Sequence, residues 1–195
     1  TEDISIMAGV SPNEDSYFGT SVFRHAKNRS LWLMLLMLSA TVTGEILGYY
    51  EDAMAVMPVL ITFIPMLMGT GGNCGSQSST LVIRGLAVGE IEFKDIFKVI
   101  FKEIRIALVV GVLLSVVNGI RIYIMYDQNI MLALALGITM IAVVTMAKCI
   151  GCILPLLAKK MGLDPAIMAA PLITTILDTC TILVYFNIVT AFFHI

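Results

Sequence analysis

The chain has 195 residues, of which 58% are hydrophobic and 13% are charged, and its mean hydropathy is +0.95. Because soluble domains carry about 25% charged residues, this composition excludes an ordinary soluble domain and predicts a surface that faces lipid. The formal net charge of −2 gives no basic footprint for nucleic acid, and the length fits one domain.

The first 30 residues are polar and contain a turn-like cluster at 11–15, followed by three basic residues between Arg24 and Arg29. They are predicted to form a cytoplasmic connector helix or linker (1–30) ahead of a transmembrane domain (31–195). The chain begins with Thr1 and has no initiator methionine and no signal peptide. It is therefore expected to be a fragment of a longer protein.

Five apolar segments are long enough to cross a membrane, because about 20 apolar residues span the hydrocarbon core. They predict an all-α integral membrane fold with five transmembrane helices. The segments cover residues 31–50, 53–83, a stretch that begins near 100 and is uncharged over 106–120, 130–158, and 165–193.

Basic residues predict the orientation of these helices. With the N-terminus in the cytoplasm, ten lysines and arginines lie on the cytoplasmic side and only Arg121 lies outside, while Lys148 falls within a span. This bias follows the positive-inside rule. The expected topology is N-in and C-out, in a multi-pass protein of the cell membrane.

Asp178 is the only acidic residue of the last segment and lies 13 residues into it. A carboxylate at that depth costs about 2.5–3.5 kcal/mol and usually faces the bundle interior or a water-filled cavity. Thr174 and Pro171 lie on the same helical face, and Pro171 is expected to free a backbone carbonyl one turn back. The alternative is a structural ion pair, for which Lys148 is the candidate partner.

The second segment contains a run at 69–79 that is rich in glycine, hydroxyl and amide groups. Such sequence is tolerated at membrane depth where it is buried in protein or lines a water-filled path. Glycines expose carbonyl oxygens, and Asn73 and Gln77 place amide oxygens on one helical face. No Gly-Lys-Ser/Thr follows, which excludes a P-loop. Close helix packing through small residues is the structural alternative, and it is compatible with ion contact.

These segments supply oxygen ligands, whereas histidine is limited to His25 and His194. Hard cations take oxygen, while softer metals recruit imidazole or thiolate. Mg²⁺ keeps much of its water, so one carboxylate with nearby carbonyls would suffice, and Mn²⁺, Co²⁺ and Ca²⁺ are the alternative ions. A single Asp178 facing a divalent ion also suggests a C2 homodimer with two copies of that carboxylate on a shared pore.

Other polar residues favour structural roles. Glu45 lies near the outer end of its helix and is expected to reach the interface, and Asp164 with Pro165 has the pattern of a helix N-cap. Cys149 and Cys152 form a C-x-x-C in mid-helix without a partner pair, which disfavours a zinc or redox site.

Two long motifs carry a family resemblance. Residues 65–87, which contain the glycine-rich run, closely resemble the signature of the MgtE magnesium channels, related to the eukaryotic solute carrier family 41. Residues 164–178 resemble the fifth-helix motif of that family. The opening residues 1–4 resemble the junction between a cytosolic regulatory region and the membrane domain.

The resemblance implies a homodimer of five-helix subunits with the pore between the second and fifth helices of both. It implies that Asp178 holds hydrated Mg²⁺, and that carbonyls around Gly69 and Gly72, with Asn73 and Thr174, line the same site. Family members usually carry cytosolic domains that sense Mg²⁺, and these domains are absent from this sequence.

Two departures from the family pattern bear on metal selectivity. Ala170 stands where the family often has asparagine, and Thr174 stands where it often has a small apolar residue. Either change alters the groups that could bond the ion's hydration shell.

The sequence therefore predicts a Mg²⁺ channel or transporter in a lipid bilayer. A cation-coupled secondary transporter of divalent metals is one alternative, and a membrane scaffold with Asp178 paired to Lys148 is the other. An enzyme is not expected, because no nucleophile–base pair and no intramembrane histidine is present.

Overall fold

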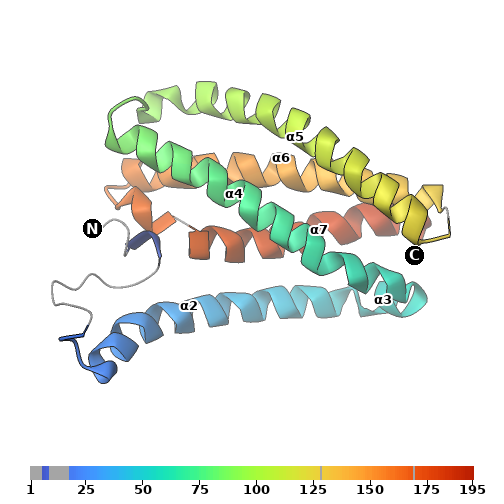
Figure 1. Ribbon diagram of the computed structural model, residues 1–195, viewed down its shortest axis with the longest axis horizontal. Helices are drawn as coiled ribbons and strands as arrows, with labels where there is room; N and C mark the ends of the chain where they lie inside the picture. Colours follow the sequence, from blue (N-terminus) through green and yellow to red (C-terminus); the bar gives the residue numbers. More distant parts are fainter. Residues whose placement is uncertain (1–5, 9–17, 128, 169) are drawn as a thin grey trace.

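The computed structural model describes residues 6–8, 18–127, 129–168 and 170–195, and these form a bundle of long helices (Figure 1). The turn-like cluster predicted at 11–15 lies outside the described residues. The elements are α2 (Val22–Tyr49), α3 (Glu51–Val56), η1 (Pro58–Phe63), α4 (Ile64–Ala87), η2 (Phe93–Asp95), α5 (Ile96–Met125), α6 (Ile130–Lys160), η3 (Pro165–Met168) and α7 (Ala170–Phe193).

The helix α2 begins at Val22, inside the segment predicted as a connector helix or linker. Ser21 caps α2 by accepting a hydrogen bond from the Arg24 amide, so residues 22–30, predicted as part of a connector, belong to the helix.

The prediction of one continuous helix over 53–83 is wrong, because two prolines divide that segment. Pro58 stands at the start of the 3₁₀ helix η1, and Pro65 stands in the first turn of α4. Proline lacks an amide proton and is tolerated at helix starts but not in helix interiors. The prediction of a continuous helix from 165 is also wrong, because that segment is divided into η3 and α7. Asp164 accepts a hydrogen bond from the Ala166 amide at 2.9 Å and caps the short helix η3 instead of α7.

The helix α6 is the centre of the bundle and packs against α5, α4 and α7. Its buried face contains small residues, and a Cβ added at Gly151 would collide with the Gly75 carbonyl of α4. A Cβ added at Gly75 would in turn collide with the Leu177 side chain of α7. Glycine at these two positions lets α4 approach both neighbours closely, as small residues do in membrane helix interfaces.

The helix α2 packs on α7 along one side only, and most of its apolar side chains are exposed. Thr43 and Thr179 share a hydrogen bond of 2.6 Å between their hydroxyl oxygens. At the far end, the Tyr50 ring stacks on Phe186 with the ring centres 4.7 Å apart. These contacts fix α2 on the side of α7.

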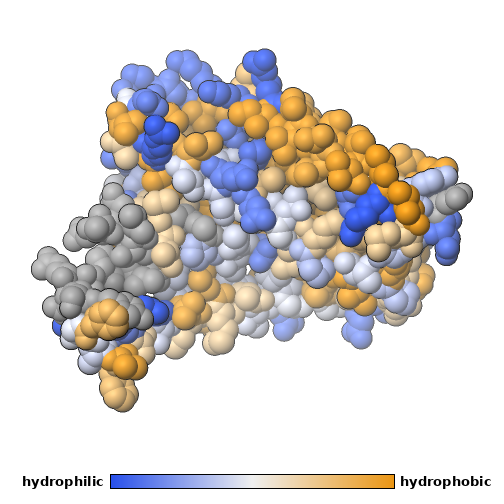
Figure 2. Space-filling model, in the orientation of Figure 1, coloured by the Kyte–Doolittle hydropathy of each residue, from blue (hydrophilic) through white to orange (hydrophobic). Residues whose placement is uncertain are grey.

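Three described helices are long and apolar enough to cross a membrane: α2, α6 and Pro171–Phe193 of α7. Figure 2 shows hydrophobic side chains over the C-terminal half of α5 and hydrophilic ones near the turn between α4 and α5. Val109 and Val117 of α5 are 72% and 60% exposed, as expected for side chains that face lipid. The assignment of α4 and α5 as two further spans stays a prediction.

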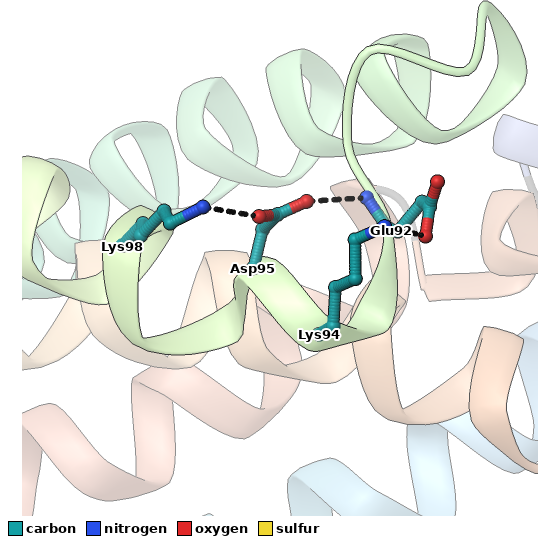
Figure 3. Close-up of polar contacts among 4 residues, drawn as sticks. All are labelled: Glu92, Lys94, Asp95 and Lys98. Atoms are coloured by element: carbon teal, nitrogen blue, oxygen red, sulfur yellow. Dashed lines mark hydrogen bonds and ion pairs between the residues drawn. The ribbon is translucent and has the colours of Figure 1, made fainter.

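Four charged side chains organise the turn between α4 and α5 (Figure 3). Asp95 accepts a hydrogen bond from the Glu92 amide at 3.2 Å and pairs with Lys98 at 2.9 Å, while Lys94 pairs with Glu92 at 2.8 Å. The hydrogen bond from Lys98, aided by the Glu92 amide, lowers the pKa of Asp95. The Glu92 carboxylate raises the pKa of Lys94.

We expect Gly75→Val to destabilise the bundle by about 1–3 kcal/mol, because the added atoms overpack the contact with Leu177. Thermal unfolding in detergent, followed by size-exclusion chromatography, measures the change. Gly44→Val is the matched control, because a Cβ at Gly44 meets nothing within 4 Å. Equal melting temperatures for the two variants would contradict the close packing of α4.

We expect Lys98→Met to raise the pKa of Asp95 toward its ordinary value, whereas Lys102→Met leaves it unchanged. Because the pKa of Asp95 is lowered in the folded state, its ionised carboxylate stabilises the turn at pH values above the ordinary aspartate pKa. This stabilisation is lost as the pH falls through the lowered pKa. Carbon-13 NMR titration of labelled aspartate, with the Asp95 signal assigned through Asp95→Asn, measures the pKa of Asp95. An Asp95 titration unmoved by Lys98→Met would show that the ion pair does not form.

Candidate cation site

A cavity of about 480 Å³ lies between α4 and α7 and collects all five residues predicted for the ion site. The helix α4 contributes its N-terminal half and α7 contributes two turns. The lining residues are Ile64, Pro65, Met68, Gly69, Gly72, Asn73, Thr174 and Asp178.

On the α4 side the polar groups of the cavity are the backbone of two glycines and the Asn73 amide, beside the apolar side chains of Ile64, Pro65 and Met68. A Cβ added at Gly72 would lie 3.0 Å from the Thr174 methyl, so this glycine allows α4 to lie close to α7 beside the cavity. A Cβ at Gly69 would meet nothing within 4 Å, so the cavity is open there. Carbonyl oxygens have two lone pairs. Those of Gly69 and Gly72 can therefore accept one helix bond and a second bond from water.

On the α7 side Asp178 lies eight residues after the start of the helix, about 12 Å along its axis. Thr174 lies one turn before it, and the Thr174 hydroxyl donates to the Pro171 carbonyl at 3.0 Å. Thr175 donates to the same carbonyl at 2.9 Å. Both bonds orient the hydroxyls while leaving their oxygens free to accept from water.

The expectation that Pro171 frees a carbonyl one turn back is wrong. Pro171 is the second residue of α7, where an amide proton has no partner inside the helix. Its ring therefore removes no hydrogen bond of the helix, and its own carbonyl is the acceptor for the two threonines.

Asp178 is partly exposed in the cavity and has no hydrogen bond or ion pair with the described residues. The structural alternative paired it with Lys148, and this pairing is wrong. Lys148 is 5% exposed and lies 3.7 Å from the Glu103 carboxylate, within the interior formed by α4, α5 and α6. The Asp178 carboxylate is therefore available to a cation.

Glu103 was not singled out by sequence reasoning, because it lies among the basic residues that open α5. A signal was present in its spacing. Glu103 precedes Ala107 and Gly111 by four and eight residues, so it shares the buried face that α5 turns to α6. A carboxylate on such a face requires a buried partner.

The other polar candidates lie away from the cavity. Glu45 is exposed near the end of α2, and Asp164 caps η3. Cys149 and Cys152 are free thiols, and no three His, Cys, Asp or Glu side chains of the described segments gather at a metal-binding distance. The side chain of Ala170 lies outside the described residues.

The arrangement offers one carboxylate, one amide, one hydroxyl and backbone carbonyls around a space that is large enough for several waters. This donor set contains only oxygen ligands for a cation, which is the preference of hard divalent ions. The helices and this cavity define an α-helical membrane protein with a candidate site for a hydrated cation.

The model of the MgtE family, described as a divalent cation transporter, matches residues 64–188. The chain therefore belongs to the MgtE family of membrane proteins.

Curated relatives agree over nearly the whole chain. It is 36% identical over 185 residues to the magnesium transporter MgtE of Bacillus subtilis, which covers 95% of this chain. It is 32% identical over 188 residues to the magnesium transporter MgtE of Thermus thermophilus, covering 96% of this chain. In both comparisons the chain spans 41% of the relative's length.

Proposed function

We propose that this chain conducts Mg²⁺ through a pore in which Asp178 holds the hydrated ion. The observation that carries the proposal is the cavity in which Asp178, Thr174, Asn73 and the Gly69–Gly72 backbone meet. The family and its magnesium-transporting relatives support Mg²⁺ as the substrate.

The binding step uses water as the link between protein and ion. Mg²⁺ dehydrates reluctantly and requires octahedral geometry at 2.0–2.1 Å. One carboxylate cannot replace its shell, so Asp178 accepts hydrogen bonds from the bound waters and supplies the opposing charge. The Gly69 and Gly72 carbonyls, the Asn73 amide and the Thr174 hydroxyl accept from the remaining waters. The ion can leave, because none of these groups coordinates it directly.

We further propose that the pore forms between two copies of the chain. In one copy the cavity is open, and Gly69 and Asn73 are exposed on its rim. A second copy related by a C2 axis would close the space and add a second Asp178, giving two negative charges against a divalent ion.

The membrane arrangement proposed is five spans, α2, α4, α5, α6 and α7, with the N-terminus in the cytoplasm. The basic start of α5 and the basic end of α6 then lie at the cytoplasmic surface. The relatives are longer than this chain, and regulatory domains in the cytosol are proposed for the full protein.

We expect Asp178→Asn to abolish or sharply reduce Mg²⁺ uptake into proteoliposomes, because it keeps the shape of the side chain and removes the charge that binds the ion. Asp164→Asn is the matched control, because it exchanges one cap for another outside the cavity. A fluorescent Mg²⁺ indicator follows uptake. Uptake that survives Asp178→Asn but is lost in Asp164→Asn would show that Asp178 is not the carboxylate that binds the ion.

We expect a single cysteine at Asn73 to form a disulfide between two copies of the chain under mild oxidation. The other four cysteines are replaced by serine or alanine, and gel electrophoresis without reductant detects the dimer. Val109→Cys is the control, because Val109 is exposed on α5, away from the cavity. Cross-linking of Val109→Cys but not of Asn73→Cys would place the interface on another face.

A further inference from the structure

A polar cluster of three buried side chains joins α4, α5 and α6 behind the cation site. Ser78 is fully buried and donates to the Glu103 carboxylate at 2.6 Å. Lys148 donates to the Ser78 oxygen at 3.3 Å and lies 3.7 Å from the same carboxylate oxygen. Glu103 and Lys148 are only 7% and 5% exposed. None of the three lines the cavity.

The cluster holds α4 from the side opposite the cavity. Ser78 follows Gly69 by nine residues, which is two and a half turns at 3.6 residues per turn. Its side chain therefore points about 180° away from the Gly69 backbone. It lies about 8 Å along the axis from Asn73. The face that lines the cavity and the face that carries Ser78 belong to one rigid helix.

The contacts of α4 with α6 and α7 near this level are made through glycine. Gly75 lies against Leu177 and Gly151, and a Cβ at Gly71 would lie 2.8 Å from the Thr181 hydroxyl oxygen. Such surfaces allow a close approach but present few protruding side chains that would resist sliding or rotation. Directional hydrogen bonds to a buried group do resist both motions.

Burial of a charged pair is not explained by stability alone. Replacing a buried ion pair by apolar side chains is often neutral or stabilising, because the loss of hydration offsets the attraction. Polar groups inside a bundle can instead specify one register of the packed helices. The direct contact of α5 with α4 is slight, so the Ser78–Glu103 bond is a polar link from the outer helix to the site-lining helix.

We propose that Glu103 and Lys148 are positioning residues that act through Ser78. They fix the rotation and depth of α4, and thereby hold the Gly69 and Gly72 carbonyls and Asn73 opposite Asp178 at the spacing of a hydrated divalent ion. The inference rests on the proposed function of the cavity, since it concerns the geometry of that same site.

The first test is Ser78→Ala, which breaks the link to α4 and leaves the Glu103–Lys148 charges in place. We expect the half-saturating Mg²⁺ concentration for uptake to rise about tenfold, which corresponds to about 1.4 kcal/mol, because α4 loses the bond that fixes its position opposite Asp178. The maximal rate per inserted protein should stay within about twofold of wild type, since the pore itself is intact.

Thr139→Val is the matched control. Thr139 is also fully buried, but its hydroxyl donates at 2.9 Å to Ala135 of its own helix. This variant loses a buried hydroxyl without cutting a link between helices, so its half-saturating Mg²⁺ concentration should match that of wild type. Equal half-saturation in Ser78→Ala, Thr139→Val and wild type would overturn the inference.

The second test is a double-mutant cycle. Glu103→Leu with Lys148→Met removes both charges together, so the bundle keeps no unpaired buried charge. This pair should raise half-saturation as Ser78→Ala does, and adding Ser78→Ala to it should change nothing further. Effects that multiply would show that Ser78 acts independently of the pair, and a wild-type value for the pair would show that the pair is not needed.

Asp178→Asn is measured alongside these variants, in uptake and in the Mg²⁺ concentration that protects the protein from thermal unfolding. If Asp178→Asn abolishes Mg²⁺ uptake and Mg²⁺-dependent thermal protection while Ser78→Ala matches wild type, the positioning role fails and the proposed site stands. If Asp178→Asn keeps both uptake and thermal protection, the proposed site fails and the positioning role fails with it.

Discussion

The close approach of α4 to α6 and α7 is the constraint on which the rest of the structure depends. Polar backbone is tolerated at membrane depth only where protein or a water-filled path surrounds it. Glycines at 72, 75 and 151 remove the side chains that would separate the three helices. The same approach brings the Gly72 backbone to Thr174, and through it the α4 carbonyls to the Asp178 carboxylate. Helix packing and the proposed ion site thus depend on one set of glycines.

The charges inside the bundle are divided between two tasks. Lys148 is neutralised by Glu103 on the far side of α4, whereas Asp178 faces the cavity without a partner among the described residues. Had Lys148 paired with Asp178, the cavity would present no net charge to a cation. In the proposed site, a buried acid at 103 therefore serves ion binding as well as packing, because it pairs with the lysine away from the cavity.

The long apolar segments and Asp178 could be picked out from sequence because their signals are local, and the family resemblance added Gly69, Gly72, Asn73 and Thr174, which line the same cavity as Asp178. Uncharged runs indicate helices, and a lone aspartate with a glycine-rich segment indicates a polar path. The breaks at Pro58 and Pro65 were missed because the surrounding residues are uniformly apolar. Hydropathy measures side-chain polarity and does not report where a proline lacks the amide proton that a continuous helix requires. The Glu103–Lys148 pair was missed because it joins residues 45 positions apart, and only the packing of α5 on α6 brings them together.

The glycine-rich run can be divided by helical face, which explains why one short stretch carries so many kinds of small residue. Gly69, Gly72 and Asn73 face the cavity, where the proposed ion site needs open space and oxygen acceptors. Gly71 and Gly75 face Thr181 and Leu177, where only the absence of a side chain permits contact. Ser78 faces the interior charges, where a hydroxyl can donate to Glu103 and accept from Lys148. A substitution in this run is therefore expected to act through the proposed ion contact, helix packing or the proposed helix register, according to its face.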